Sequence, residues 1–173
     1  MAQTTFGQTD SLALVVASFL NTLNATPGSF CTPLAADRRF ALVTDLALIP
    51  AWGSPASVDV FPDIENTERT GLTTFKSDYA IHIFIQQQTS GTDEEAACAL
   101  LTQLRSQIIE ALKPVRLALP NAVHPLAAGS LVLTHAKSAD RSPGNPAGLY
   151  NLSRLLDAHV YESDTILIFK AAA

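Results

Sequence analysis

The chain has 173 residues, of which 47% are hydrophobic and 16% charged, and its formal net charge is −5. This length fits one domain with a sizeable core, so we predict a single domain over residues 1–173. The acidic balance, without a cluster of Lys and Arg, argues against a nucleic-acid-binding protein. Because so little charge is available to cover the outside, part of the apolar surface is expected to be an interface.

The cysteines and the N-terminal segment bear on the compartment. Cys31 and Cys98 are the only cysteines of the sequence, and they form neither a disulfide framework nor a zinc-binding spacing. The N-terminal residues lack the basic start and apolar run of a signal peptide, and no apolar run approaches the roughly 18 residues of a membrane span. We therefore expect reduced thiols, a cytosolic origin and no membrane partner.

The first elements in chain order are a helix, a strand and a short turn. Asp10 can cap an amphipathic helix that Pro27 and Gly28 end. Residues 38–44 (Arg-Arg-Phe-Ala-Leu-Val-Thr) are typical of a strand, and residues 45–50 of a helical turn stopped by a proline.

A long β-hairpin is predicted over residues 57–88. Its first strand spans 57–64, a polar loop spans 65–71, and the return strand spans 72–88. At about 3.3 Å per residue the return strand reaches roughly 55 Å, against a width of about 40 Å for a compact domain of this size. Unbroken, the hairpin would overhang its own domain, whereas a bulge or break near Lys76 would shorten it. The alternation of the return strand separates an apolar face (Tyr79, Ile81, Ile83 and Ile85) from a second face (Ala80, His82, Phe84, Gln86 and Gln88).

A second helix follows the hairpin. Thr92 is its predicted cap, with Asp93, Glu94 and Glu95 in the first turn, where the helix dipole favours negative charge. Pro114 ends the helix. Its predicted buried stripe consists of Ala97, Leu100, Leu101, Leu104, Ile108, Ala111 and Leu112.

The C-terminal third is predicted to contain a strand over 131–137, a short helix over 150–156 and a last strand over 159–170, joined by loops over 115–130 and 138–148. Together the elements predict an α+β fold: a mixed, mainly antiparallel sheet with a long protruding hairpin, flanked by two main helices.

The histidines give no sign of a metal site. No pair has the spacing that would place two imidazoles on one metal. His82 and His135 lie on strands that could be neighbours, but the spacing places no carboxylate or cysteine with them. We expect structural histidines and no metal.

Four carboxylates gather along the hairpin: Asp59, Asp63, Glu65 and Glu68. Acid–base catalysis needs two carboxylates at a fixed separation in a cleft, whereas an exposed arm favours a solvated or lumen-facing edge. No nucleophile elbow, phosphate loop, dinucleotide fingerprint or metalloprotease motif occurs. We therefore expect a protein that is not an enzyme, with no catalytic residue and no cofactor.

The order of several features resembles a known family. They are Arg38-Arg-Phe, Asp45-Leu, the strand Val58-Asp-Val-Phe-Pro, the Asp78-Tyr strand ending in Gln, a helix begun by Asp and Glu, and a closing alternating strand. This order, over roughly residues 11–170, resembles the tail terminator and tail completion (neck) proteins of long-tailed bacteriophages. The resemblance implies a mixed sheet flanked by helices, and a ring of six copies that caps the tail tube and joins it to the head connector, without a cofactor.

The resemblance also implies a location and partners. The protein would belong to the tail or neck of the virion and assemble in the host cytoplasm. Its partners would be further copies of itself, the tail tube protein, the head-tail connector or stopper protein, and genomic DNA that passes through the lumen without specific binding. An under-paired hairpin edge could add strands to a neighbouring subunit. Lumen or neighbour contacts would come from Asp63, Glu65, Glu68 and Arg69, and salt bridges between subunits from Arg38, Arg39 and Asp78.

Other interpretations stay open. The loops 115–130 and 138–148 look longer than the family core needs, so the chain could be another neck or minor tail protein. It could also be a monomeric ligand-binding or enzymatic domain with His82 and His135 near a pocket, or a bacterial assembly protein of a tail-like secretion or injection system.

Overall fold

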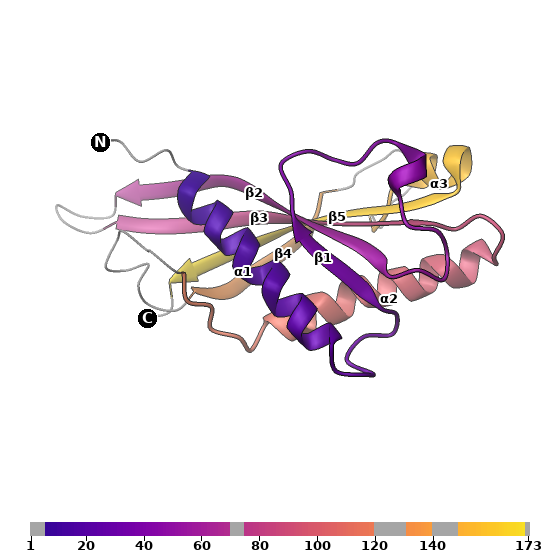
Figure 1. Ribbon diagram of the computed structural model, residues 1–173. Coiled ribbons are helices and arrows are strands. Elements are labelled where there is room, and N and C mark those ends of the chain that lie inside the picture. The colour runs from indigo at the N-terminus through magenta and orange to yellow at the C-terminus, as the bar shows by residue number, and fades with distance from the viewer. Residues whose placement is uncertain (1–5, 70–74, 120–130, 140–148, 172–173) are drawn as a thin grey trace.

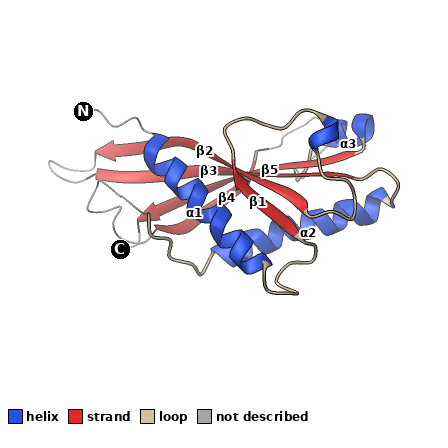
Figure 2. Ribbon diagram, in the orientation of Figure 1, coloured by secondary structure: helices blue, strands red, loops and turns tan. Residues whose placement is uncertain are grey.

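A computed structural model describes residues 6–69, 75–119, 131–139 and 149–171 (Figures 1 and 2). These residues form one five-stranded sheet, in the order β1-β2-β3-β5-β4. The strand β1 pairs parallel with β2, and the other pairs are antiparallel. The predicted α+β fold with a mixed, mainly antiparallel sheet is confirmed. The elements are α1 (Phe6–Asn24), β1 (Leu34–Arg38), η1 (Leu46–Leu48), β2 (Ala56–Arg69), β3 (Phe75–Gln88), α2 (Glu94–Leu112), β4 (Leu131–Ser138), α3 (Leu152–Ala158) and β5 (Val160–Ala171).

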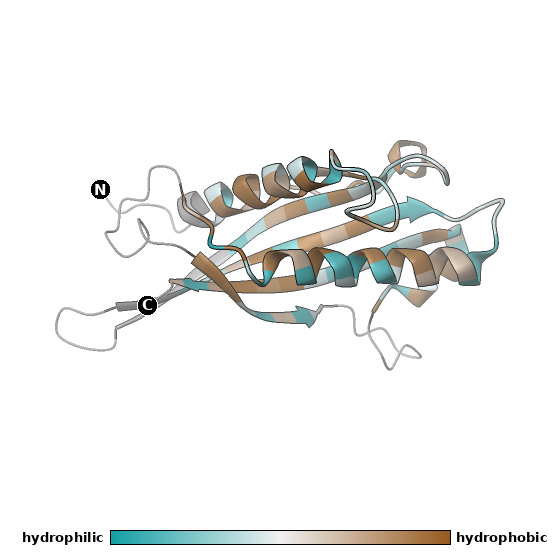
Figure 3. Cartoon of the chain, turned by 90° about the horizontal axis from the view of Figure 1, so that it is seen from below, coloured by the Kyte–Doolittle hydropathy of each residue, from teal (hydrophilic) through white to brown (hydrophobic). Residues whose placement is uncertain are grey.

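The two long helices pack on the same face of the sheet (Figure 3). Side chains of α2, among them Ile108, meet Ile83, Ile85 and Leu167 of the central strands. The alternation of β3 predicts this face correctly, because Tyr79, Ile81, Ile83 and Ile85 are all buried. We call the opposite face of the sheet, which carries His82, Phe84, Gln86 and Gln88, the polar face.

Both long helices begin at a different residue from the predicted one. The helix α1 starts at Phe6, so Asp10 lies inside it and does not cap it. Asp10 instead accepts a hydrogen bond from Arg38. In α2 the cap is Asp93 and not Thr92, since the Asp93 carboxylate accepts from two backbone N–H groups of the first turn. Two adjacent residues can both act as caps, and the sequence does not distinguish them.

The predicted strand over 38–44 is wrong. The strand β1 ends at Arg38, where the predicted strand began, and Arg39 donates one more backbone bond to β2, to the Val60 oxygen at 2.9 Å. The chain then leaves the edge of the sheet and crosses the polar face. The helical turn is confirmed as η1, with the Asp45 carboxylate accepting from the backbone of Ala47.

The first strand of the hairpin is longer and less regular than predicted. The strand β2 continues to Arg69, so most of the predicted loop 65–71 is strand. An irregularity interrupts β2 between Pro62 and Glu65, while β3 is unbroken near Lys76. The hairpin extends past β1, and past β5 by the residues Phe75–Ser77 (Figure 1). The tip and the predicted start of the return strand, residues 70–74, lie outside the described residues.

The C-terminal elements follow the prediction within two residues at each end. Most of the predicted loops 115–130 and 138–148 lies outside the described residues, although Leu117 pairs with Leu131 at the edge of the sheet. Among the helices described, none combines the length and apolar character needed to cross a membrane.

Candidate interaction surface

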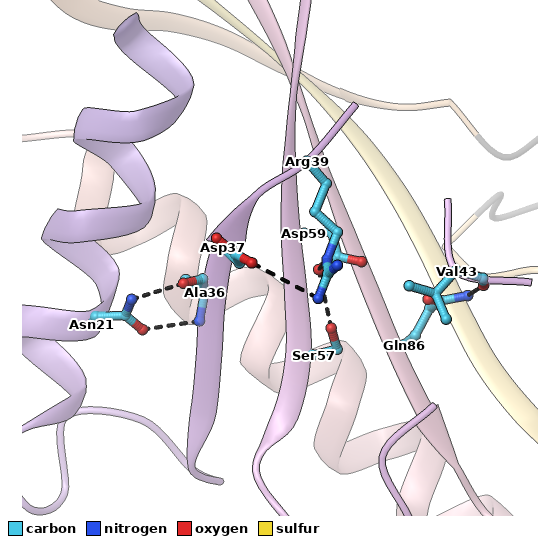
Figure 4. A network of polar contacts seen from close by, with 8 residues as sticks. All are labelled: Asn21, Ala36, Asp37, Arg39, Val43, Ser57, Asp59 and Gln86. Atoms are coloured by element: carbon cyan, nitrogen blue, oxygen red, sulfur yellow. Dashed lines mark hydrogen bonds and ion pairs between the residues drawn. The ribbon is translucent and has the colours of Figure 1, made fainter. Parts of the chain in front are cut away.

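A strap, which we define as residues 39–50, crosses the polar face between β1 and the start of β2. Its backbone is held by two glutamine side chains of β3. The Gln86 amide donates to the Val43 oxygen at 3.1 Å (Figure 4). The Gln88 amide donates to the oxygens of Leu46 and Ile49 at 2.8 and 2.9 Å. Because these carbonyl groups of the strap accept hydrogen bonds from the sheet, they fix the path of the strap over it.

The strap turns large apolar side chains toward solvent. The exposed fractions are 69% for Phe40, 51% for Leu42, 43% for Leu46 and 70% for Leu48. Single exposed apolar residues are ordinary, but several within one short, anchored segment are typical of a protein-protein contact. The guanidinium of Arg38 lies 4.7 Å from the Phe40 ring centroid and supports the ring from one side.

The base of the strap is an ion pair with a buried carboxylate. Asp59 is 1% exposed, and its Oδ1 accepts from Arg39 Nε at 2.8 Å and from Ser57 Oγ at 3.1 Å (Figure 4). Asp37 lies 3.8 Å from the same guanidinium. A buried carboxylate needs a partner of this kind, so the charge of Arg39 stabilises the fold and fixes the start of the strap.

The structure does not bring the predicted interface residues together. Three of them have ion-pair partners inside the chain: Arg38 with Asp10, Arg39 with Asp59, and Asp78 with Lys170 at 3.5 Å. Glu65, Glu68 and Arg69 lie on the part of β2 beyond its pairing with β1, and their side chains are not among those that the structure describes. A role of these residues in subunit contacts stays a prediction.

His82 lies on the polar face between two carboxylates. Its Nδ1 is 2.9 Å from Asp164 Oδ1, and its Nε2 is 3.2 Å from Asp63 Oδ2. The hydrogen bond to Asp164 raises the pKa of His82 above its ordinary value, helped by the charge of Asp164 and by Asp63, and opposed by burial. The imidazole of His82 thus links the strands β2, β3 and β5.

The two histidines of the ligand-binding interpretation are not neighbours. The strand β5 separates β3 from β4, with His82 opposite Ile166 and His135 opposite Ile168. The expectation that their strands are adjacent is wrong, because β5 inserts between them. Within the described ranges, no group of His, Cys, Asp and Glu is arranged to hold a metal ion.

A cavity of about 400 Å³ lies away from these histidines, between the start of α2, Tyr150 and Leu155 of α3. Glu94, Glu95 and Cys98 contribute to its wall. Burial raises the pKa of Cys98 to about 11, so its thiol is protonated at neutral pH and is a poor nucleophile.

The exposed side chains of the strap were not predicted from the sequence. The available signal was Phe40 and Leu42 in the predicted strand and Leu46 and Leu48 in the predicted helical turn. In a strand Phe40 and Leu42 would share one face, and an apolar face of a strand is normally buried. Only the path of the strap over the sheet shows that they face solvent.

Comparison with known proteins gives little further guidance. No protein family matches the chain, and no curated protein matches it. Among solved structures, the chain is similar to one described as "Virion of native gene transfer agent (GTA) particle". The identity is 14% and the TM-score 0.47, over 97% of this chain and 99% of that chain. At this TM-score and identity, no family follows from the likeness.

Proposed function

We propose that the chain is a virion structural protein that forms a ring, of six copies by its resemblance to tail terminators, at the head-tail joint. In this role the ring caps the tail tube, docks the head connector and lets DNA pass. The observation that carries the proposal is the strap, because its backbone is bonded to two glutamines of β3, one of them buried, while four large apolar side chains are exposed to solvent. A surface of this kind is more stable when another protein covers it.

Two further features support assembly over chemistry. The elements follow one another in the order of the tail terminator resemblance, with a hairpin between a first long helix and a second one. The net charge of −5 suits a wall along which DNA moves without adhering.

The first experiment is to measure the mass of the purified chain in solution by light scattering and to image the same sample by negative stain. We expect rings, either from the chain alone or after addition of tail tubes polymerised from the tail tube protein of the same virus. Rings of about six copies bound to one end of the tubes would support the proposal. A monomer that stays monomeric and does not bind the tubes would contradict it.

A further inference from the structure

We infer that copies of this chain join head to tail through their sheets, with β4 of one copy pairing along the outer half of β2 of the next. The inference rests on the proposed ring and assigns its subunit contact. We define the outer half of β2 as residues 61–69.

Among the described residues, both strands have an edge without a partner strand. The pairing of β1 with β2 stops at Val60, so along residues 61–69 the part of the chain that the structure describes places β3 on one side of β2 and no strand on the other. On the far side of the sheet, β4 pairs with β5. The outer edge of β4 has one backbone partner among the described residues, Leu117, which bonds Leu131. Unpaired edges of this kind are templates for strand addition.

The two edges lie at the same level of the sheet. Following the register across the strands, Ser138 is level with Thr165, Ile83 and Val60. At the other end, Val132 is level with Lys170, Asp78 and Asn66. The strand β4 therefore lies at nearly the same levels of the sheet as the part of β2 that does not pair with β1. The two open stretches are similar in length.

The strand directions favour the pairing. Because β2 with β3, β3 with β5 and β5 with β4 are all antiparallel pairs, β2 and β4 run in opposite directions. Rotation about a ring axis would place β4 of one copy antiparallel to β2 of the next, and the alternation would continue from subunit to subunit. Since the contact joins two different edges, it is heterologous and leaves an open edge until the ring closes.

Each edge also carries an irregularity, and the two lie at neighbouring levels. The strand β2 shifts register between Pro62 and Glu65, opposite Ile81 and Tyr79. The strand β4 shifts between Leu133 and His135, opposite Phe169 and Ile168. Bulges and a proline, which has no N–H to donate, discourage pairing with a flat foreign strand. The β4 strand of a second copy has its own irregularity at a neighbouring level. The two irregular edges therefore fit each other better than they fit a flat strand.

The charges of the two edges are complementary. His135 and Lys137 are exposed on β4, whereas the outer half of β2 contains three carboxylates, Asp63, Glu65 and Glu68, and one cation, Arg69. Lys137 is opposite Ile166, which is level with His82 and Phe61. Lys137 of one copy would thus lie beside Phe61 and Asp63 of the next.

The test is disulfide cross-linking of assembled rings, in a background with Cys31→Ser and Cys98→Ala. A chain carrying both Asn66→Cys and Val132→Cys is expected to give a ladder of oligomers after oxidation, up to a closed ring. Each single variant alone is expected to give none, and a mixture of the two single variants is expected to give dimers only. Moving the second cysteine from Val132 to Thr134 or Lys137 locates the register.

The outcomes separate this inference from the proposed function. Rings that form but cross-link at none of these positions would overturn the edge pairing and leave the ring intact. Dimers from Asn66→Cys alone would show a two-fold contact and also overturn it. The absence of rings, with and without tail tubes, would overturn the proposed function and the inference together.

A charge reversal provides a second measurement. Lys137→Glu places like charges across the contact and is expected to weaken ring assembly roughly two- to fivefold per contact. Lys113→Glu is the matched control, since Lys113 is also exposed but lies after α2, where it pairs with Glu110. Equal assembly of the Lys137 variant and wild type would contradict the charge argument.

Discussion

At the scale of single residues, His82 joins three strands of the polar face through its two ring nitrogens. Its partners, Asp63 and Asp164, come from β2 and β5. Because the pKa of His82 is raised in the folded chain, folding favours the protonated imidazole. Its contribution to stability is fully present below the ordinary value of about 6.5. The contribution is lost as the pH rises through the higher pKa of the folded state.

We expect Asp164→Asn to lower the pKa of His82 more than Asp63→Asn, because the hydrogen bond to Asp164 is the main cause of the shift. The His82 ring signals, followed by NMR between pH 5 and 9, measure the pKa in each variant. His82→Gln should also reduce the loss of urea stability that wild type shows over the pH range where His82 titrates. Equal effects of the two Asn variants would contradict the assignment.

The glutamine anchors of the strap give a second prediction at this scale. Gln88→Ala removes both bonds to the strap carbonyls of Leu46 and Ile49. It should lower the free energy of unfolding by about 1–2 kcal/mol and speed amide exchange in residues 46–49. Gln103→Ala, at an exposed position on α2, is the control and should change neither quantity. Unchanged exchange in the Gln88 variant would show that other contacts hold the strap.

At the scale of elements, different parts of the strap serve folding and assembly. Its polar backbone contacts the sheet, while Phe40 and Leu48 are mostly exposed. Substituting these side chains should leave the fold nearly unchanged.

We expect Phe40→Ser combined with Leu48→Ser to change the free energy of unfolding by no more than about 0.5 kcal/mol per site and to abolish ring formation or tube binding. Urea denaturation and light scattering measure the two effects. Leu14→Ser is the control, since Leu14 on α1 is 53% exposed but lies outside the strap. If the strap variant assembles as wild type does, the strap is not an interface.

The helix α2 shows how closely a helical pattern can predict burial. Leu101, Leu104 and Ile108 of the predicted stripe are buried, whereas Leu100 is partly exposed and Cys98 is buried although it was not predicted. The difference arises at the border of the stripe, where the neighbours of the helix decide which side chains are covered.

Leu104→Ala should therefore destabilise the chain by about 2–5 kcal/mol, because it leaves a cavity under α2. Leu100→Ala should cost less, and Leu156→Ala, at an exposed position on α3, should cost little. Urea unfolding of the three variants measures the order. A Leu104 variant as stable as the Leu156 variant would contradict the packing of α2 on the sheet.

At the scale of the whole molecule, the buried side chains form one continuous core that extends from α1 through the sheet to α2 and α3. Trp52, at the end of the strap, packs against this core. A single domain over residues 1–173 stays a prediction, and cooperative unfolding would test it.

We expect unfolding in urea to be a single transition, with the same midpoint by Trp52 fluorescence and by far-UV circular dichroism. Trp52 is the only tryptophan of the chain, so its fluorescence reports on one place near the strap. An earlier fluorescence transition would show that the strap region unfolds before the sheet and that the chain does not behave as one cooperative unit.

The sequence by itself determined the features with a local period. The alternation of β3 and the stripe of α2 are set by backbone geometry within one segment, so both could be predicted before the segments were placed together. The end of β1, the strap and the level of the two open edges depend on partners far along the chain. Residues 38–44 show the limit of prediction from the sequence. Their β-propensity is that of a strand, but Gln86 holds this segment, and Gln88 holds the turn after it, across the polar face. Which apolar residues remain outside, and which sheet edges remain open, was decided only by the tertiary structure.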